Sequence, residues 1–178
     1  MNNVKVSMMT SQHKSREVFH EELQACIERA IATKDVEIMP ASPFKNIEEF
    51  TGLFDSIDGN RGIIKTPYQD VVVEIEDAFI HFTKNTYYKN RENIKGGFFS
   101  TFRDPLFIVE KPKNGRSVPS TYFYKPFYDK GKNIMSLFGI GISKNGKINF
   151  KTYYFDARGN RLNEILNGRN VVIKYIKK

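Results

Sequence analysis

The residues of this chain that are best suited to chemistry begin at His81, the only histidine beyond residue 20. Lys84, Lys89 and Arg91 follow it within ten residues. An imidazole has an unperturbed pKa of about 6.5, so it can accept or donate a proton near neutral pH. Ammonium and guanidinium groups stabilise negative charge on a phosphate. These residue types suit a metal-free RNA-cleaving site, and the alternative is an ordinary basic domain whose histidine is structural or solvated.

RNA carries its own nucleophile, the 2′-hydroxyl, so a protein that cleaves it need only move two protons and stabilise a phosphorane. Further candidates for contact with the phosphate are Arg103, Lys125 and Lys151, and Thr152 supplies a hydroxyl. No phosphate-cradling glycine motif, paired metal-binding carboxylates or Ser-His-Asp order is evident in the sequence. We therefore predict neither a cofactor nor a metal.

Aromatic and basic residues alternate in two runs, Tyr122-Phe123-Tyr124-Lys125 and Lys151-Thr152-Tyr153-Tyr154. Such interleaving is typical of surfaces that stack bases beside phosphate contacts. Tyrosines on a sheet also pack into the core, and this remains the alternative for each of them.

The charge of the chain changes sign close to His81. Residues 1–80 carry 8 Lys and Arg against 14 Asp and Glu, a net charge of −6, whereas residues 81–178 carry 20 against 6, a net charge of +14. The whole chain has a net charge of +8, which favours polyanions, chiefly nucleic acid, as partners over acidic proteins or a membrane. The segregation predicts an acidic extension over residues 1–60 and a basic domain over residues 61–178.

Composition narrows the class of protein further. The single cysteine, Cys26, excludes an intrachain disulfide and a cysteine-cluster metal site, and its place in a helical pattern predicts a buried thiol. Neither a membrane-spanning run nor a signal peptide is evident, so we expect a cytoplasmic protein, either made there or delivered to a target cell.

Hydrophobic spacing predicts helices first and strands afterwards. The predicted helices cover about residues 15–33 and 43–56, and a polar segment over residues 86–95 is a further candidate. A hairpin is expected over residues 61–75, followed by strands near 106–109, 121–125, 134–143, 148–154 and 171–176, with a helical turn at 162–166. Lys144-Asn145-Gly146 predicts a tight hairpin turn between the strands over 134–143 and 148–154. In the strand over 134–143, Gly139 and Gly141 share a face and leave a bed that a helix or a substrate backbone can approach. This order predicts an α+β fold with an antiparallel sheet.

From Ile63 onward the chain resembles the phage-type branch of the barnase–EndoU–colicin–RelE-like ribonucleases. The matching pieces lie between about residues 61 and 156: Thr66-Pro67 before the Val71–Ile75 strand, His81, Lys89, Arg91, Thr101, Asp104-Pro105, the Ile108 strand, Tyr124-Lys125 and Thr152-Tyr153-Tyr154. Gly96-Gly97 and the acidic extension depart from the pattern.

The resemblance implies a compact, metal-independent toxin or effector ribonuclease that often acts on tRNA and leaves a 2′,3′-cyclic phosphate. It implies His81 as acid or base, Arg91 and Lys125 on phosphate, and Thr152 with Tyr154 along the cleft. Lys84, Lys89, Arg103, Tyr122, Tyr124 and Lys151 would then contact RNA, and an immunity or antitoxin protein would be a further partner. The rival readings are a non-catalytic RNA- or DNA-binding module and a phage-associated interaction protein.

Overall fold

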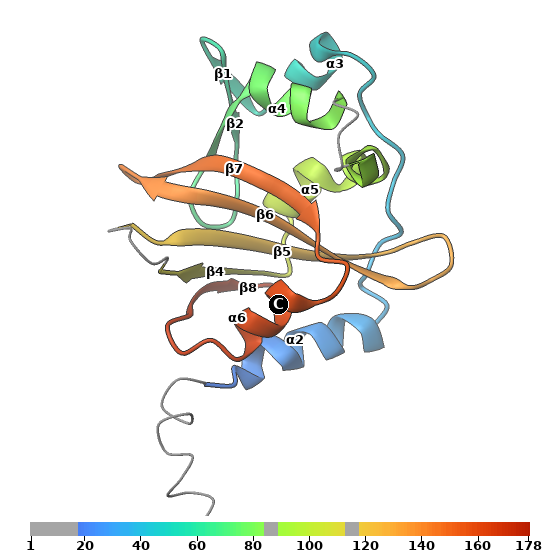
Figure 1. Cartoon of the computed structure of the whole chain (residues 1–178), viewed down its shortest axis with the longest axis vertical. Coiled ribbons are helices and arrows are strands. Elements are labelled where there is room, and N and C mark those ends of the chain that lie inside the picture. The colour runs from blue at the N-terminus through green and yellow to red at the C-terminus, as the bar shows by residue number, and fades with distance from the viewer. Residues whose placement is uncertain (1–17, 84–88, 113–117) are drawn as a thin grey trace, which may run out of the picture.

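The computed structural model describes residues 18–83, 89–112 and 118–178, and within them one mixed sheet lies between two layers of helices (Figure 1). The sheet has eight strands in the order β1-β2-β3-β7-β6-β5-β4-β8. The strands are β1 (Ser56–Asp58), β2 (Arg61–Ile64), β3 (Val71–Glu74), β4 (Phe107–Lys111), β5 (Ser120–Tyr128), β6 (Ile134–Lys144), β7 (Lys147–Phe155) and β8 (Val172–Ile176). The helices are α2 (Glu21–Ala32), α3 (Ile47–Thr51), α4 (Ile75–Thr83), the 3-10 helix η1 (Lys89–Gly97), α5 (Phe98–Arg103) and α6 (Asn160–Leu166).

Each face of the sheet has its own hydrophobic core. The α4-side core is rich in phenylalanine and joins α3, α4 and α5 to the sheet; it includes Phe44, Phe50, Phe82, Phe98, Phe102 and Phe123. The α6-side core joins α2 and α6 to the opposite face and includes Leu23, Cys26, Ile27, Ile165, Tyr124 and Phe138. Because successive side chains of a strand point to opposite faces, the neighbours Phe123 and Tyr124 of β5 enter different cores.

The α+β prediction is confirmed, but the prediction of a purely antiparallel sheet is wrong. Strand β3 pairs in parallel with β7, through Val71 with Ile148 and Val72 with Asn149. Every other neighbouring pair is antiparallel. The helices α4, η1 and α5 and the strands β4, β5 and β6 intervene between β3 and β7 in the chain, so no hairpin turn dictates their relative direction.

Local patterns located most elements but missed the helices α4 and α5 and the short strand β1. The hairpin of β2 and β3 is confirmed, and α2 lies inside the range predicted for the first helix. The second helix is shorter than predicted and starts after Asn46, whose side chain accepts a hydrogen bond from the Glu49 amide. Sequence reading extended the β3 strand to Ile75, but Ile75 begins α4.

A β-bulge in β7 overturns the face pattern that strict alternation predicts there. Ile140 pairs with Thr152 whereas Gly141 pairs with Phe150, so Lys151 is the extra residue. Ile148 and Phe150 therefore face the α4-side core together with Tyr153, and Thr152 and Tyr154 face the other side. Strict alternation predicts instead that Ile148, Phe150, Thr152 and Tyr154 share one face.

The described part of the acidic extension contributes to both cores. Leu23 of α2 is fully buried against the α6-side core, and Phe44 and Phe50 are buried in the α4-side core. The predicted boundary at residue 60 falls between β1 and β2, which pair as a hairpin. Residues 18–60 are thus built into the same folded unit as the basic part of the chain.

Candidate nucleic-acid interface

His81 lies in the last turn of α4. Ile75, Ala78 and Phe82 lie on one side of this helix, which packs against the α4-side core, and all three are buried. His81 falls outside that stripe and its side chain is exposed. The imidazole is therefore available at the surface of the α4 layer.

Two other candidate cations are engaged with carboxylates. The Lys125 side chain is 8% exposed and lies 3.0 Å from Asp104 and 3.2 Å from Glu37. Arg103, at the end of α5, pairs with Asp55 at 3.4 Å, donates to the Leu53 carbonyl and lies over the Phe99 ring. In the structure both side chains connect separate elements.

The candidate tyrosines differ in their access to solvent. Tyr124 is 1% exposed and stacks on Phe107, and Tyr122 is 5% exposed, so neither ring presents a face on which a base could stack. Burial raises the pKa of Tyr124 to about 12 despite the hydrogen bond with Ser136, which acts in the opposite direction. Tyr154 is partly exposed on the α6 side of β7.

The structure does not bring the predicted catalytic residues together. His81 belongs to the layer over the α4-side core, whereas Thr152 and Tyr154 lie on the opposite face of the sheet. Lys84 lies outside the described residues. The backbone of Lys89 and Arg91 belongs to η1, but their side chains lie outside the described part as well.

A different set of residues shares one accessible surface, which we call the open face. It is the α6 side of β2, β3, β7 and the distal half of β6, and no residue of β1, β2 or β3 belongs to the α6-side core. Its residues are at least partly exposed and include Arg61, Ile63, Val72, Ile142, Lys144, Lys147, Asn149, Lys151 and Thr152. Their strand neighbours Ile64, Val71 and Ile148 are fully buried on the other side. Among the described elements, no helix packs over this surface.

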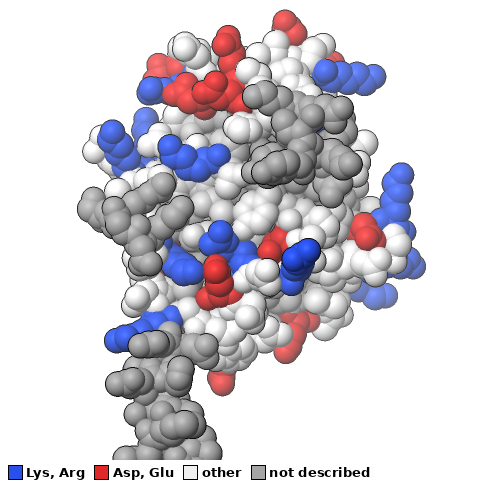
Figure 2. All heavy atoms as spheres, viewed as in Figure 1, with Lys and Arg blue, Asp and Glu red and all other residues white. Residues whose placement is uncertain are grey.

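The open face is basic at the turn between β6 and β7. Lys144 and Lys147 face each other in the register, across Asn145 and Gly146, whose positive φ angles of 55° and 77° form the tight turn. The bulge adds the exposed Lys151 to the same side. No described carboxylate lies within ion-pair distance of these three lysines. Figure 2 shows Lys and Arg side chains gathered at the left edge of the molecule, where Figure 1 places the turn between β6 and β7.

Two hollows flank this turn. One, of about 480 Å³, is lined by Arg61, Lys144 and Lys147 together with Asp58, Ile63, Val72, Asn145 and Asn149. The other, of about 640 Å³, is lined by Lys144 and Lys151 with Val118, Ile142, Ser143, Asn145 and Asn149. Among the described cations that line the two hollows, Arg61 forms an ion pair with Glu74 at 2.8 Å. Both hollows are open and have lysine side chains in their lining, as a surface for an extended polyanion would.

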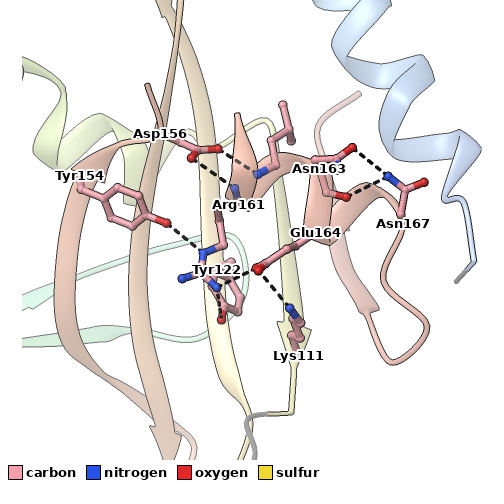
Figure 3. A network of polar contacts seen from close by, with 9 residues as sticks. Lys111, Tyr122, Tyr154, Asp156, Arg161, Asn163, Glu164 and Asn167 are labelled. Carbon is pink, nitrogen blue, oxygen red and sulfur yellow. Dashed lines mark hydrogen bonds and ion pairs between the residues drawn. The ribbon is translucent and has the colours of Figure 1, made fainter. Parts of the chain in front are cut away.

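Where the open face meets α6, Arg161 organises a polar network (Figure 3). Its Nε donates to the Tyr154 hydroxyl at 2.9 Å, and one terminal nitrogen reaches Tyr122 at 3.4 Å and Glu164 at 3.2 Å. Lys111 of β4 approaches the same Glu164 oxygen at 3.4 Å. The guanidinium also lies over the Tyr122 ring, 5.3 Å from its centroid.

Local sequence holds Arg161 in place. Gly159, with a φ of 73°, turns the chain into α6, and the Asp156 carboxylate accepts hydrogen bonds from the amides of Arg161 and Leu162. Burial raises the pKa of Tyr154, and the adjacent Arg161 only partly opposes this, so the hydroxyl keeps its proton at neutral pH. Tyr154 can therefore accept from Arg161 and still donate to a ligand.

Sequence reasoning overlooked Lys144, Lys147 and Arg161. The Lys-Asn-Gly-Lys turn was recognised as a hairpin, and lysines on both sides of such a turn must lie together, so this pair could have been found. No local signal connects Arg161 to Tyr122 and Tyr154, because the three come from separate elements.

Comparison with protein families, curated proteins and solved structures finds no match to this chain. The resemblance to ribonucleases therefore rests on the residues quoted above. Within the described ranges, no helix is long and apolar enough to cross a membrane, and no cluster of three or more His, Cys, Asp or Glu side chains has the arrangement of a metal site.

Proposed function

We propose that this protein binds nucleic acid, RNA in the first place, through the open face of its sheet, and that the contacts are chiefly to phosphates. The single observation that carries the proposal is the group of Lys144, Lys147 and Lys151, which share one exposed surface without a described carboxylate partner. The other two predicted cations whose side chains the structure describes, Lys125 and Arg103, are paired with carboxylates.

Phosphate contacts position a nucleic acid without reading its sequence. The rings of Tyr122 and Tyr124 are buried, so base stacking on them does not contribute. We therefore expect binding with little sequence preference and a strong dependence on salt, because each phosphate contact releases condensed counterions.

The test compares wild type with the triple variant K144Q/K147Q/K151Q, using a fluorescent 20-nucleotide RNA whose anisotropy is followed at several salt concentrations. Loss of each phosphate contact should reduce the slope of log affinity against log salt by about 0.7 for a single strand. We expect the triple variant to bind at least tenfold more weakly at low salt and to show a slope reduced by about 2.

A matched variant removes the same charge elsewhere. K45Q/K130Q/K132Q replaces three exposed lysines, of which Lys130 and Lys132 lie at the β5–β6 turn, the opposite end of β6 from Lys144. This variant should keep most of the affinity and slope. Equal losses in both triple variants would show that net charge alone, and not the open face, holds the RNA.

Endoribonuclease activity is our second proposal, and the exposed position of His81 favours it. Because Thr152 and Tyr154 lie across the sheet from His81, cleavage would have to use His81 without them. The proposed activity is metal-independent transesterification to a 2′,3′-cyclic phosphate, in the manner of a toxin or effector, with RNA such as tRNA as substrate. Incubation of the protein with total RNA in EDTA, followed by analysis of the product ends, tests it.

A further inference from the structure

In the network around Arg161, two cations share one carboxylate. Two cations, Arg161 and Lys111, share a single carboxylate oxygen of Glu164, at 3.2 Å and 3.4 Å. The Glu164 side chain is 53% exposed, whereas those of Arg161 and Lys111 are 33% and 27% exposed. The cations are thus the more enclosed partners, and the anion between them comes from the solvent side.

Arg161 also determines which other hydrogen-bond donors of this network are left for a ligand. The second terminal nitrogen of Arg161 makes no hydrogen bond or ion pair with the described residues, and in Figure 3 one nitrogen of the guanidinium has no dashed line. The hydroxyls of Tyr154 and Tyr122 accept from the guanidinium, so their own protons are directed elsewhere. A planar fork, an ammonium and two hydroxyls are donors of the types that bind phosphate groups.

We propose that Arg161 and Lys111 form a phosphate-binding subsite, and that Glu164 occupies it as an internal competitor. This proposal rests on the proposed function and deepens it: the subsite takes a phosphodiester of the RNA that lies along the open face. Tyr154 connects the two, since it lies on β7 near Thr152 and its hydroxyl accepts a hydrogen bond from Arg161. A phosphate arriving there replaces the Glu164 carboxylate, which then turns to solvent.

The proposal predicts that removing the competing charge strengthens binding. E164Q keeps the shape of the side chain and should raise affinity for the 20-nucleotide RNA by about three- to tenfold, as expected for loss of a half-exposed ion-pair partner. E76Q is the matched control, because it removes one exposed carboxylate from α4, in the layer on the opposite side of the sheet. It should raise affinity by less than twofold.

The double variant R161Q/E164Q tests whether Arg161 is responsible for the higher RNA affinity expected of E164Q. If Arg161 takes the phosphate, the gain of E164Q disappears in the double variant, and the salt slope falls by about 0.7. Replacing Arg161 with Lys in place of Gln keeps the charge but loses the planar fork. R161K should therefore restore only part of the RNA affinity that R161Q loses. A gain that persists in R161Q/E164Q would overturn the subsite.

Two further readouts separate this proposal from its rivals. A network that only fixes α6 in place would make E164Q less stable to heat without raising RNA affinity, and equal affinities of E164Q and E76Q would overturn the proposal. Failure of the proposed function has a different signature: K144Q/K147Q/K151Q would bind RNA as wild type does. In that case the melting temperatures of E164Q and R161Q/E164Q in inorganic phosphate and in chloride still test the subsite, since a bound anion stabilises the fold. Phosphate should raise the melting temperature of E164Q more than that of R161Q/E164Q, and equal rises would overturn the subsite, because phosphate stabilises any fold in a general way.

Discussion

Lys125 Nζ lies 3.0 Å from Oδ2 of Asp104, and 2.8 Å from the carbonyl oxygen of the same residue. The pair joins the middle of β5 to the residue that follows α5, and Glu37 completes it from the segment after α2. Lys177, one residue after β8, also donates to Asp104 at 3.0 Å. Four distant parts of the chain therefore meet at one charged cluster.

Replacing Lys125 should reduce stability more than it reduces RNA binding. Lys125→Met keeps the aliphatic stem and removes the charge, which leaves two carboxylates without their enclosed partner. We expect the free energy of unfolding to fall by about 1–3 kcal/mol, measured by urea denaturation. Lys130→Met, at an exposed turn, should change it by less than about 0.5 kcal/mol. Normal stability with a large loss of RNA affinity would instead return Lys125 to the phosphate-binding role.

Acid should weaken the same cluster through Asp104. Burial alone would raise the pKa of this carboxyl, but hydrogen bonds from Lys125 and Lys177 outweigh it and hold the pKa below its ordinary value. The ionised carboxylate therefore stabilises the fold above the unfolded pKa of about 3.9, and this contribution is lost as pH falls through the folded pKa.

The measurement is the difference in unfolding free energy between wild type and Asp104→Asn, obtained by urea denaturation at each pH. It should be constant at neutral pH and shrink below about pH 4. A difference that persists unchanged to about pH 2 would show that the ionised form of Asp104 is not the stabilising one.

Gly139 should resist substitution because the ring of Phe102 occupies the space above it. A Cβ atom at this position would lie 2.4 Å from Phe102 Cζ, within the buried α4-side core. Gly139→Ala should therefore destabilise the protein by about 1–3 kcal/mol in urea denaturation. In F102L/G139A the two effects should not add, since the smaller side chain leaves room for the methyl group. Strict additivity would contradict this contact.

Truncation should test whether the acidic extension is part of the folded unit. Deleting residues 1–56 removes Leu23, Phe44 and Phe50, each at most 1% exposed, from both cores. Loss of one such phenylalanine alone typically costs about 3–5 kcal/mol, a large share of the stability of a domain. We expect circular dichroism to show no cooperative unfolding for the truncated protein. A folded product with raised RNA affinity would support the alternative, an extension that shades the basic surface.

The ribonuclease proposal predicts a loss of cleavage without a loss of folding when His81 is replaced. His81→Ala changes an exposed side chain, so its melting temperature should stay within a few degrees of wild type. Cleavage of total RNA in EDTA should fall by about 10²–10⁴, the usual contribution of a proton-transfer group. Thr152→Val, across the sheet, should leave cleavage unchanged. Full activity of His81→Ala would exclude the mechanism.

Local sequence was enough to predict features that depend on neighbours in the chain. The periodicity of α2, the β2–β3 hairpin and the Lys144–Lys147 turn are set by short-range geometry, and all three occur as expected. The glycine bed of β6 was predicted to admit a helix or a substrate backbone. Phe102 of α5 does lie over Gly139, whereas the close neighbours of Gly141 are Ile148 and Asn149 of β7. The spacing of Ile75, Ala78 and Phe82 could have revealed α4, had the preceding β-rich run not been extended into it.

Only the tertiary structure decided which residues share a surface. One extra residue at Lys151 reverses the face of everything after it in β7, and a bulge of this kind leaves no mark in a pattern of alternating side chains. Pairing of β3 with β7 likewise depends on contacts between distant segments. For this reason the sequence could propose basic and hydroxyl residues only by their type. The fold separated His81 from Thr152 and Tyr154, enclosed Lys125 among carboxylates, and brought Arg161 to the edge of the open face.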